Sequence, residues 1–147
     1  MERAFHMLLY RAFHAQRSYL RPSLKEIGLG SGQPKLLAYL WQYGPCSQKQ
    51  LADYFELDPA GICRMLDSLE RNGFIVRDAV QGDRRTGLIR LTDRGRRAQE
   101  RWRERCREME DLLLEGFTPQ EQAAFADYLS RAYHNLRAGR KGGGSAV

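Results

Sequence analysis

The chain has few of the features that mark membrane or secreted proteins. No apolar run in its 147 residues approaches the roughly 20 residues that a membrane-spanning helix needs. Charged residues interrupt the apolar ones near the start, which predicts an amphipathic helix there rather than a signal peptide. The three cysteines, Cys46, Cys63 and Cys106, are widely spaced and form no CxxC pair, which is typical of reduced thiols. We therefore expect a cytoplasmic protein without a membrane segment or a disulfide framework.

Groups for catalysis and metal binding are scarce as well. The three histidines, His6, His14 and His134, are not accompanied by cysteines or carboxylates at metal-ligand spacing. The sequence also has no phosphate-binding loop and no persuasive nucleophile–base arrangement. These absences predict a protein that is not an enzyme and that holds neither a metal nor a cofactor.

The charge that is present is basic overall but unevenly placed. The formal net charge of +6 points toward nucleic acid. Residues 36–92 nevertheless balance their basic and acidic side chains, whereas residues 93–107 are rich in arginine. Arg94, Arg96 and Arg97 oppose the helix dipole there, so contact with DNA phosphates and a solvated charged face are both plausible. A DNA contact in residues 36–92 must therefore come from a few well-placed side chains.

Start and stop signals predict six helices and one hairpin. Ser47 to Gln50 and Thr118 to Glu121 form capping boxes, Asp58 precedes a proline at the first helical position, and Pro22 is expected to end the first helix. Asn72-Gly73 predicts a left-handed helix end. The expected helices span about 2–21, 31–43, 47–56, 58–72, 93–115 and 118–138.

Two short helices followed by a hairpin predict a winged helix-turn-helix. The apolar runs 74–80 and 88–91 form the two arms of the hairpin, and Gly82, Asp83, Arg84 and Arg85 lie between them. Arginine at such a tip suits a narrow DNA minor groove, and Asp83 could hold the Arg85 guanidinium through paired hydrogen bonds. The alternative is a solvated surface hairpin with a local Asp–Arg pair.

The same residues resemble a known family. The resemblance covers about residues 7–136 and rests on three stretches: GLGSGQPKLLAYLWQYGPCSQKQLADYF, LDPAGICRMLDSLERNGFIVRD and GDRRTGLIRLTDRG. The last stretch is the most specific. It contains Asp-x-Arg, a strand that ends in Leu-Thr, and a helix start that contains glycine. This order is similar to the wing of the MarR family of bacterial transcription regulators. The resemblance implies that helix 58–72 enters the major groove and that Arg85, oriented by Asp83, enters the minor groove.

The expected DNA contacts lie in the two short helices and the wing. Arg64 is the best base reader, because a bidentate arginine–guanine contact is the commonest specific pairing, although Arg64 could instead pair with Asp67 or Glu70. Ala60 and Gly61 stand where the family often has Ser or Thr, and they allow apolar contact with a thymine methyl. Residues 47–49 could offer amides to a phosphate or serve only as a cap. The full predicted set is Ser47, Gln48, Lys49, Asp58, Ala60, Gly61, Arg64, Arg77, Asp83, Arg84 and Arg85.

The resemblance also implies a homodimer and a ligand. The family pairs its first and last helices, which here carry the apolar residues Phe5, Leu8, Leu9, Phe13, Phe125, Leu129, Tyr133 and Leu136. A small, often aromatic, ligand binds where the dimer helices meet the winged domain. Candidates for that site, which are otherwise ordinary core residues, are Tyr10, His14, Arg17, Tyr39, Tyr43 and Trp102.

We therefore expect a mainly α fold with a small β-hairpin wing. The expected parts are an N-terminal dimerisation helix (1–30), a winged helix-turn-helix (31–92), a long helix with a C-terminal dimerisation helix (93–138) and a disordered tail (139–147). The expected function is a ligand-responsive homodimeric repressor that binds a pseudo-palindromic operator in double-stranded DNA. Cys63 lies on the expected reading helix, where it is a small apolar residue or, alternatively, an oxidant sensor. The rival interpretation is a winged-helix module that binds protein without specific DNA binding.

Overall fold

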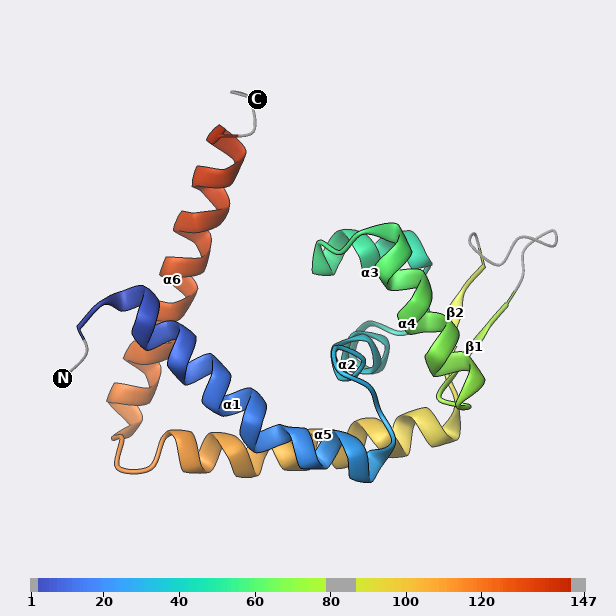
Figure 1. Cartoon of the computed structure of the whole chain (residues 1–147), viewed down its shortest axis with the longest axis horizontal. Helices are drawn as coiled ribbons and strands as arrows, with labels where there is room; N and C mark the ends of the chain where they lie inside the picture. Colours follow the sequence, from blue (N-terminus) through green and yellow to red (C-terminus); the bar gives the residue numbers. More distant parts are fainter. Residues whose placement is uncertain (1–2, 79–86, 144–147) are drawn as a thin grey trace. The chain divides into compact units, whose positions relative to one another are not determined.

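The computed structural model describes residues 3–78 and 87–143, with side chains to residue 139. The predicted mainly α fold with a small β-hairpin is confirmed (Figure 1). The elements are α1 (Phe5–Ile27), α2 (Pro34–Tyr43), α3 (Gln48–Phe55), α4 (Pro59–Arg71), β1 (Ile75–Arg77), β2 (Ile89–Leu91), α5 (Asp93–Leu113) and α6 (Pro119–Gly143). The chain forms two compact units, residues 1–109 and residues 110–147, with the division inside α5.

The core of the first unit joins α2, α3, α4 and the hairpin. Its fully buried side chains come from all of these elements, because each presents an apolar face at its own periodicity. They are Leu36, Leu37, Leu51, Ile62, Leu66, Leu69, Phe74, Ile75 and Ile89. Ala98 of α5 and the end of α1 pack against the same core. The winged domain thus has one continuous hydrophobic centre.

The two strands are antiparallel, with Ile75 opposite Leu91 and Arg77 opposite Ile89. Cys46, just before α3, adds an isolated bridge to Ile89 through two backbone hydrogen bonds of 2.7 and 3.3 Å. The outer part of the predicted hairpin, residues 79–86, lies outside the described residues. The described hairpin base is therefore tied both to the end of α4 and to the start of α3.

The predicted end of the first helix at Pro22 is wrong. Helix α1 continues through Pro22 to Ile27 and ends at Gly28, whose backbone has φ +91° and whose amide donates to the Leu24 carbonyl. Proline removes one backbone hydrogen bond from a helix interior. Burial of Ile27 and packing of Leu24 against the core offset that loss, which no local signal shows.

The other predicted helix signals hold. Ser47 and Gln50 form the capping box of α3, Asp58 caps α4, and Gly73 follows α4 with φ +83°. Thr118 and Glu121 exchange the two hydrogen bonds of the third cap. Helix α6, however, extends to Gly143, beyond the start of the expected tail at Gly139. No helix among the described residues is long and apolar enough to cross a membrane.

Candidate nucleic-acid interface

The start of α3 offers a capped helix N-terminus. The Gln50 amide donates to Ser47 Oγ over 3.1 Å, and the Ser47 amide donates to Gln50 Oε1 over 2.8 Å. Lys49 is exposed and pairs with Asp53, which raises the pKa of Lys49. Gln48 was predicted to contact DNA, but its side chain lies in the interior and the residue is only 9% exposed. Of the three predicted residues at this start, Ser47 and Lys49 remain accessible and Gln48 does not.

Helix α4 buries one face in the core and leaves the opposite face open. Arg64 is exposed on this helix and makes no ion pair with any described residue. The alternative pairing of Arg64 with Asp67 or Glu70 is therefore not what the structure shows. Arg64 remains available to a base edge, as Ala60 does to a thymine methyl.

Asp58 and Gly61 form the cap of this helix. The carboxylate of Asp58 accepts a hydrogen bond from the Gly61 amide. A Cβ at position 61 would lie 2.8 Å from Asp58 Oδ1, so a larger residue there would displace the Asp58 carboxylate.

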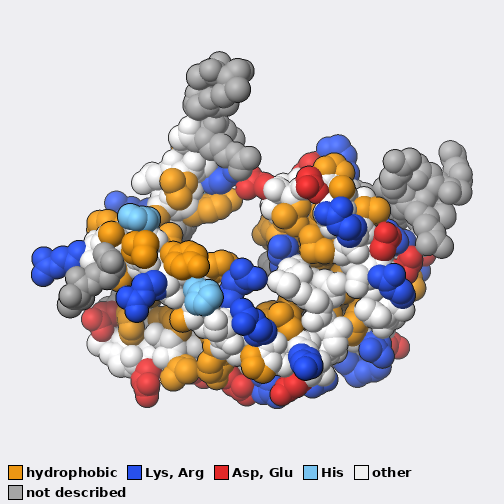
Figure 2. Space-filling model, viewed as in Figure 1, with side chains coloured by type: hydrophobic (Ala, Val, Ile, Leu, Met, Phe, Trp, Pro, Cys, Tyr) orange, Lys and Arg blue, Asp and Glu red, His pale blue; other side chains and the backbone are white. Residues whose placement is uncertain are grey.

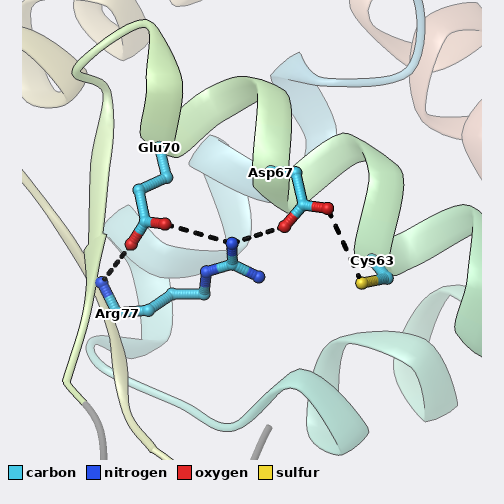
Figure 3. Close-up of polar contacts among 4 residues, drawn as sticks. All are labelled: Cys63, Asp67, Glu70 and Arg77. Atoms are coloured by element: carbon cyan, nitrogen blue, oxygen red, sulfur yellow. Dashed lines mark hydrogen bonds and ion pairs between the residues drawn. The ribbon is translucent and has the colours of Figure 1, made fainter. Parts of the chain in front are cut away.

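Arg77 was predicted to contact DNA, yet its side chain lies between α4 and β1. Its guanidinium Nη2 donates to Asp67 Oδ1 over 2.5 Å and to Glu70 Oε1 over 3.1 Å (Figure 3). Only 6% of the side chain is exposed. The hydrogen bond from Arg77 holds the pKa of Asp67 below its usual value. Two carboxylates of the preceding helix therefore hold this side chain inward in the single chain, away from the exposed face of α4.

The base of the wing carries a second ion pair. Arg90 on β2 donates through Nε and Nη2 to the two carboxylate oxygens of Asp78, over 2.8 and 3.0 Å. The hydrogen bond from Arg90 lowers the pKa of Asp78. The predicted tip residues Asp83, Arg84 and Arg85 lie outside the described residues.

The start of α5 is basic and close to the hairpin. The Arg94 guanidinium lies 4.8 Å from the centre of the Phe74 ring, and Arg96 pairs with Asp93 at 2.9 Å. Arg94, Arg96 and Arg97 are all exposed. Sequence reasoning missed the stacking of Arg94 on Phe74, because the two residues come from different elements.

The predicted ligand residues divide among three places in the first unit. Arg17 and Trp102 line a cavity of about 840 Å³ between α1, the following loop, α2 and α5. Tyr10 and His14 stack on each other along α1 and are not among the residues that line it. Tyr39 and Tyr43 belong instead to an aromatic cluster with Tyr54 and Phe55. The six predicted residues therefore do not share one cavity in this structure.

The cavity has a distinct chemical character. Its cationic lining residues are Arg17, Arg21, Lys25 and Lys35, and none of the described residues that line it carries a carboxylate. Its apolar walls come from Phe13, Leu20, Leu24, Leu29, Pro34, Ala38 and Trp102. Apolar walls with a few convergent charges are typical of small-molecule sites. The described residues contain no group of three or more histidines, cysteines or carboxylates that could hold a metal ion.

An exposed helix beside a capped short helix and a hairpin base defines a helix-turn-helix transcription regulator of the winged type. Comparison with known proteins agrees. Residues 29–86 match the model of the MarR family. The HTH-type regulator YxaD of Bacillus subtilis is 30% identical over 114 residues, which cover 77% of this chain and 80% of that protein. YwhA of the same organism is 30% identical over 96 residues, which cover 65% and 69% of the two chains.

Solved structures agree with these relatives. The crystal structure of MarR has a TM-score of 0.81 at 27% identity and covers 95% of this chain and 97% of its own. A MarR-family regulator from Silicibacter pomeroyi has a TM-score of 0.73 at 26% identity, with 88% and 87% covered. The chain belongs to the MarR family. It is thus a DNA-binding transcription regulator and not an enzyme.

Proposed function

We propose that the chain is a homodimeric repressor that reads a pseudo-palindromic operator with α4. The observation that carries the assignment is Arg64, which is exposed in the middle of this helix and pairs with none of the described residues. A dimer places two such helices about one turn of DNA, roughly 34 Å, apart. The capped start of α3 supplies amides to a phosphate, and Lys49 adds a charge beside them. In this proposal the minor groove is contacted by Asp83, Arg84 and Arg85.

The exposed apolar residues of the first and last helices support a dimer. Helix α1 leaves Phe5 88% and Phe13 54% exposed, and hydrophobic side chains are visible along it in Figure 2. Helix α6 leaves Leu129, Tyr133 and Leu136 exposed in the single chain. Monomeric soluble proteins rarely expose contiguous apolar patches of this kind. A second copy of the chain would remove both faces from water.

Selection from a random DNA pool, followed by fluorescence anisotropy on the selected and a scrambled duplex, tests the operator proposal. We expect selected sequences with two inverted half-sites, and binding that weakens steeply with salt because phosphate contacts release counterions. Arg64→Ala should relax the preference at one position in each half-site, and Arg85→Ala should weaken binding at least tenfold. Equal, weak binding of both duplexes would instead favour the module that binds a protein partner.

The cavity supports a ligand that is aromatic and anionic. Four cations without a lining carboxylate favour a carboxylate, and the apolar walls favour a ring. In BpsR of Bordetella bronchiseptica, which has the same fold at a TM-score of 0.75, 6-hydroxynicotinic acid regulates DNA binding. We propose that such a ligand releases this chain from its operator by favouring another spacing of the two α4 helices.

Titration of the protein–operator complex with 6-hydroxynicotinic acid and with its neutral amide tests the ligand. We expect the acid to lower the anisotropy and the amide to have a much smaller effect. Lys25→Gln should weaken the response to the acid, whereas Arg11→Gln, on α1 but outside the cavity lining, should not. Equal responses to acid and amide would contradict the anionic assignment.

A further inference from the structure

Arg77 joins the hairpin to α4 through both its backbone and its side chain. The main-chain amide of Arg77 donates to Glu70 Oε2 over 3.2 Å. Its guanidinium Nη2 donates to Glu70 Oε1 over 3.1 Å. The same Nη2 donates to Asp67, one turn earlier on α4 (Figure 3). One residue of β1 is thus fixed at three points to two successive turns of α4.

The cluster contains one guanidinium and two carboxylates. Burial disfavours the charged form of Arg77, but the hydrogen bonds to Asp67 and Glu70 outweigh it and raise the pKa of Arg77. Arg77 is surrounded by two carboxylates, so the three side chains together carry no positive charge to offer a phosphate. Asp67 itself is 52% exposed, so the cluster reaches from the interior to the surface of α4.

The cluster lies where the parts of the DNA-binding unit meet. Arg77 is opposite Ile89 in the strand pair, and Ile89 is bridged to Cys46 immediately before the α3 cap. Arg77 is therefore one of the contacts, with the buried Phe74 and Ile75, that hold the hairpin base against α4. A change of angle at this point moves the hairpin relative to the exposed face that carries Arg64.

We propose that Arg77, with Asp67 and Glu70, is a positioning residue that sets the sequence specificity of DNA binding without touching DNA. The buried ion cluster holds α4 and the hairpin base in one relative orientation. Only in that orientation do α4 and the hairpin both fit the preferred DNA sequence. In some proteins a buried polar or ionic group selects one geometry over others, and we infer the same role for this cluster. The inference rests on reading by α4, as in the proposed function.

The experiment compares Arg77→Met and Glu70→Gln with the wild type on the selected duplex and on a scrambled duplex, at three salt concentrations. We expect both variants to bind the selected duplex at least tenfold more weakly. Affinity for the scrambled duplex should change less than about twofold, and the salt slope should stay the same. Glu70→Gln is the sharper variant, because removing an acid near DNA should by simple electrostatics strengthen binding.

Asp53→Asn is the matched control. It also removes an acid and breaks an ion pair in the helix-turn-helix, but the Lys49–Asp53 pair is exposed and joins residues of one helix. We expect its ratio of selected to scrambled affinity to equal that of the wild type.

The other outcomes are distinct. If Arg77 contacts a phosphate directly, Arg77→Met weakens both duplexes equally and lowers the salt slope by about 0.9 for each lost contact, which overturns the proposal. If circular dichroism shows that Arg77→Met is unfolded, the test rests on Glu70→Gln. An unchanged ratio of selected to scrambled affinity in Glu70→Gln overturns the proposal as well. A wild type that does not distinguish the duplexes contradicts the proposed operator binding instead.

Discussion

Gly95 is the position where a single added carbon should do most harm to the winged domain. A Cβ at this residue would lie 2.1 Å from the carbonyl oxygen of Phe74 and 3.1 Å from Leu91 Cδ2. The first turn of α5 rests directly on the backbone at the junction of α4 and β1. The Phe74 oxygen cannot easily move aside, because it accepts a hydrogen bond from the Thr92 amide over 3.1 Å. Thr92 also accepts from the Gly95 amide through Oγ, which holds this turn in place.

The cost of Gly95→Ala follows from these distances. Relieving the clash requires a backbone shift, since Cβ atoms essentially never come within 3.0 Å of another heavy atom and this one would lie 2.1 Å from a backbone oxygen. Overpacking of this kind costs about 1–3 kcal/mol, and loss of the Thr92–Phe74 hydrogen bond adds about 1 kcal/mol. The higher helix propensity of alanine stabilises α5 by about 1 kcal/mol relative to glycine. We expect a net loss of about 2 kcal/mol, or roughly 4–8 °C in Tm.

Thermal unfolding by circular dichroism at one fixed protein concentration measures this loss. Gly139→Ala is the matched control, because it also places alanine in a helix but meets no heavy atom within 4 Å. We expect the control to unfold at the wild-type temperature or slightly above it. A Tm of Gly95→Ala within about 1 °C of the wild type would refute the reasoning, since no compensating gain in this turn is large enough to hide the clash.

Three further predictions follow from single contacts. Ser47→Ala removes the cap of α3 and should lower the free energy of unfolding by about 1 kcal/mol in urea titrations; an unchanged midpoint and slope would contradict this cap energy. Asp67→Asn should be less stable than the wild type at pH 7. Because Arg77 lowers the pKa of Asp67 in the folded protein, the stabilisation is complete above the unfolded pKa, near 3.8. It is lost as the pH falls through the folded pKa, so a difference between the two proteins that persists at pH 2 would rule out this linkage. Burial raises the pKa of the Cys46 thiol to about 11. Native Cys46 should therefore resist iodoacetamide at pH 8 until the protein unfolds. If native Cys46 were labelled as fast as the half-buried Cys63, the Cys46 thiol would be accessible and this prediction would be wrong.

Arg77 is the residue whose position in the fold differs most from what its place in the sequence suggests. In the sequence it is one of several arginines near a predicted wing, and all of them looked equally able to reach a phosphate. Its partners Asp67 and Glu70 precede it by ten and seven residues, on another element. Helical spacing rules relate residues three or four apart and cannot detect such a pair. The pair forms only because the turn at Gly73 folds β1 back along α4.

The predicted ligand residues lie apart for a similar reason. Aromatic residues of α1 and α2 were expected to converge, but the rotation of each helix against the core sends Tyr39 toward Tyr54 and leaves Tyr10 beside His14. Of the six predicted residues, only Arg17 and Trp102 line the cavity. Its other cations, such as Lys25 and Lys35, come from the last turns of α1 and the first turn of α2, and their convergence has no periodic signature.

The sequence by itself determined the features that depend on neighbours along the chain. The caps at Ser47, Asp58 and Thr118, the left-handed turn at Gly73 and the order of helices around one hairpin are of this kind, because each rests on residues within one turn of each other. Tertiary structure alone decided that α1 passes through Pro22, since the energy that permits it comes from packing against the distant core. It also decided which charges remain available to DNA. Arg64 and Arg77 look alike in the sequence, and only the fold gives one of them two carboxylate partners and leaves the other exposed.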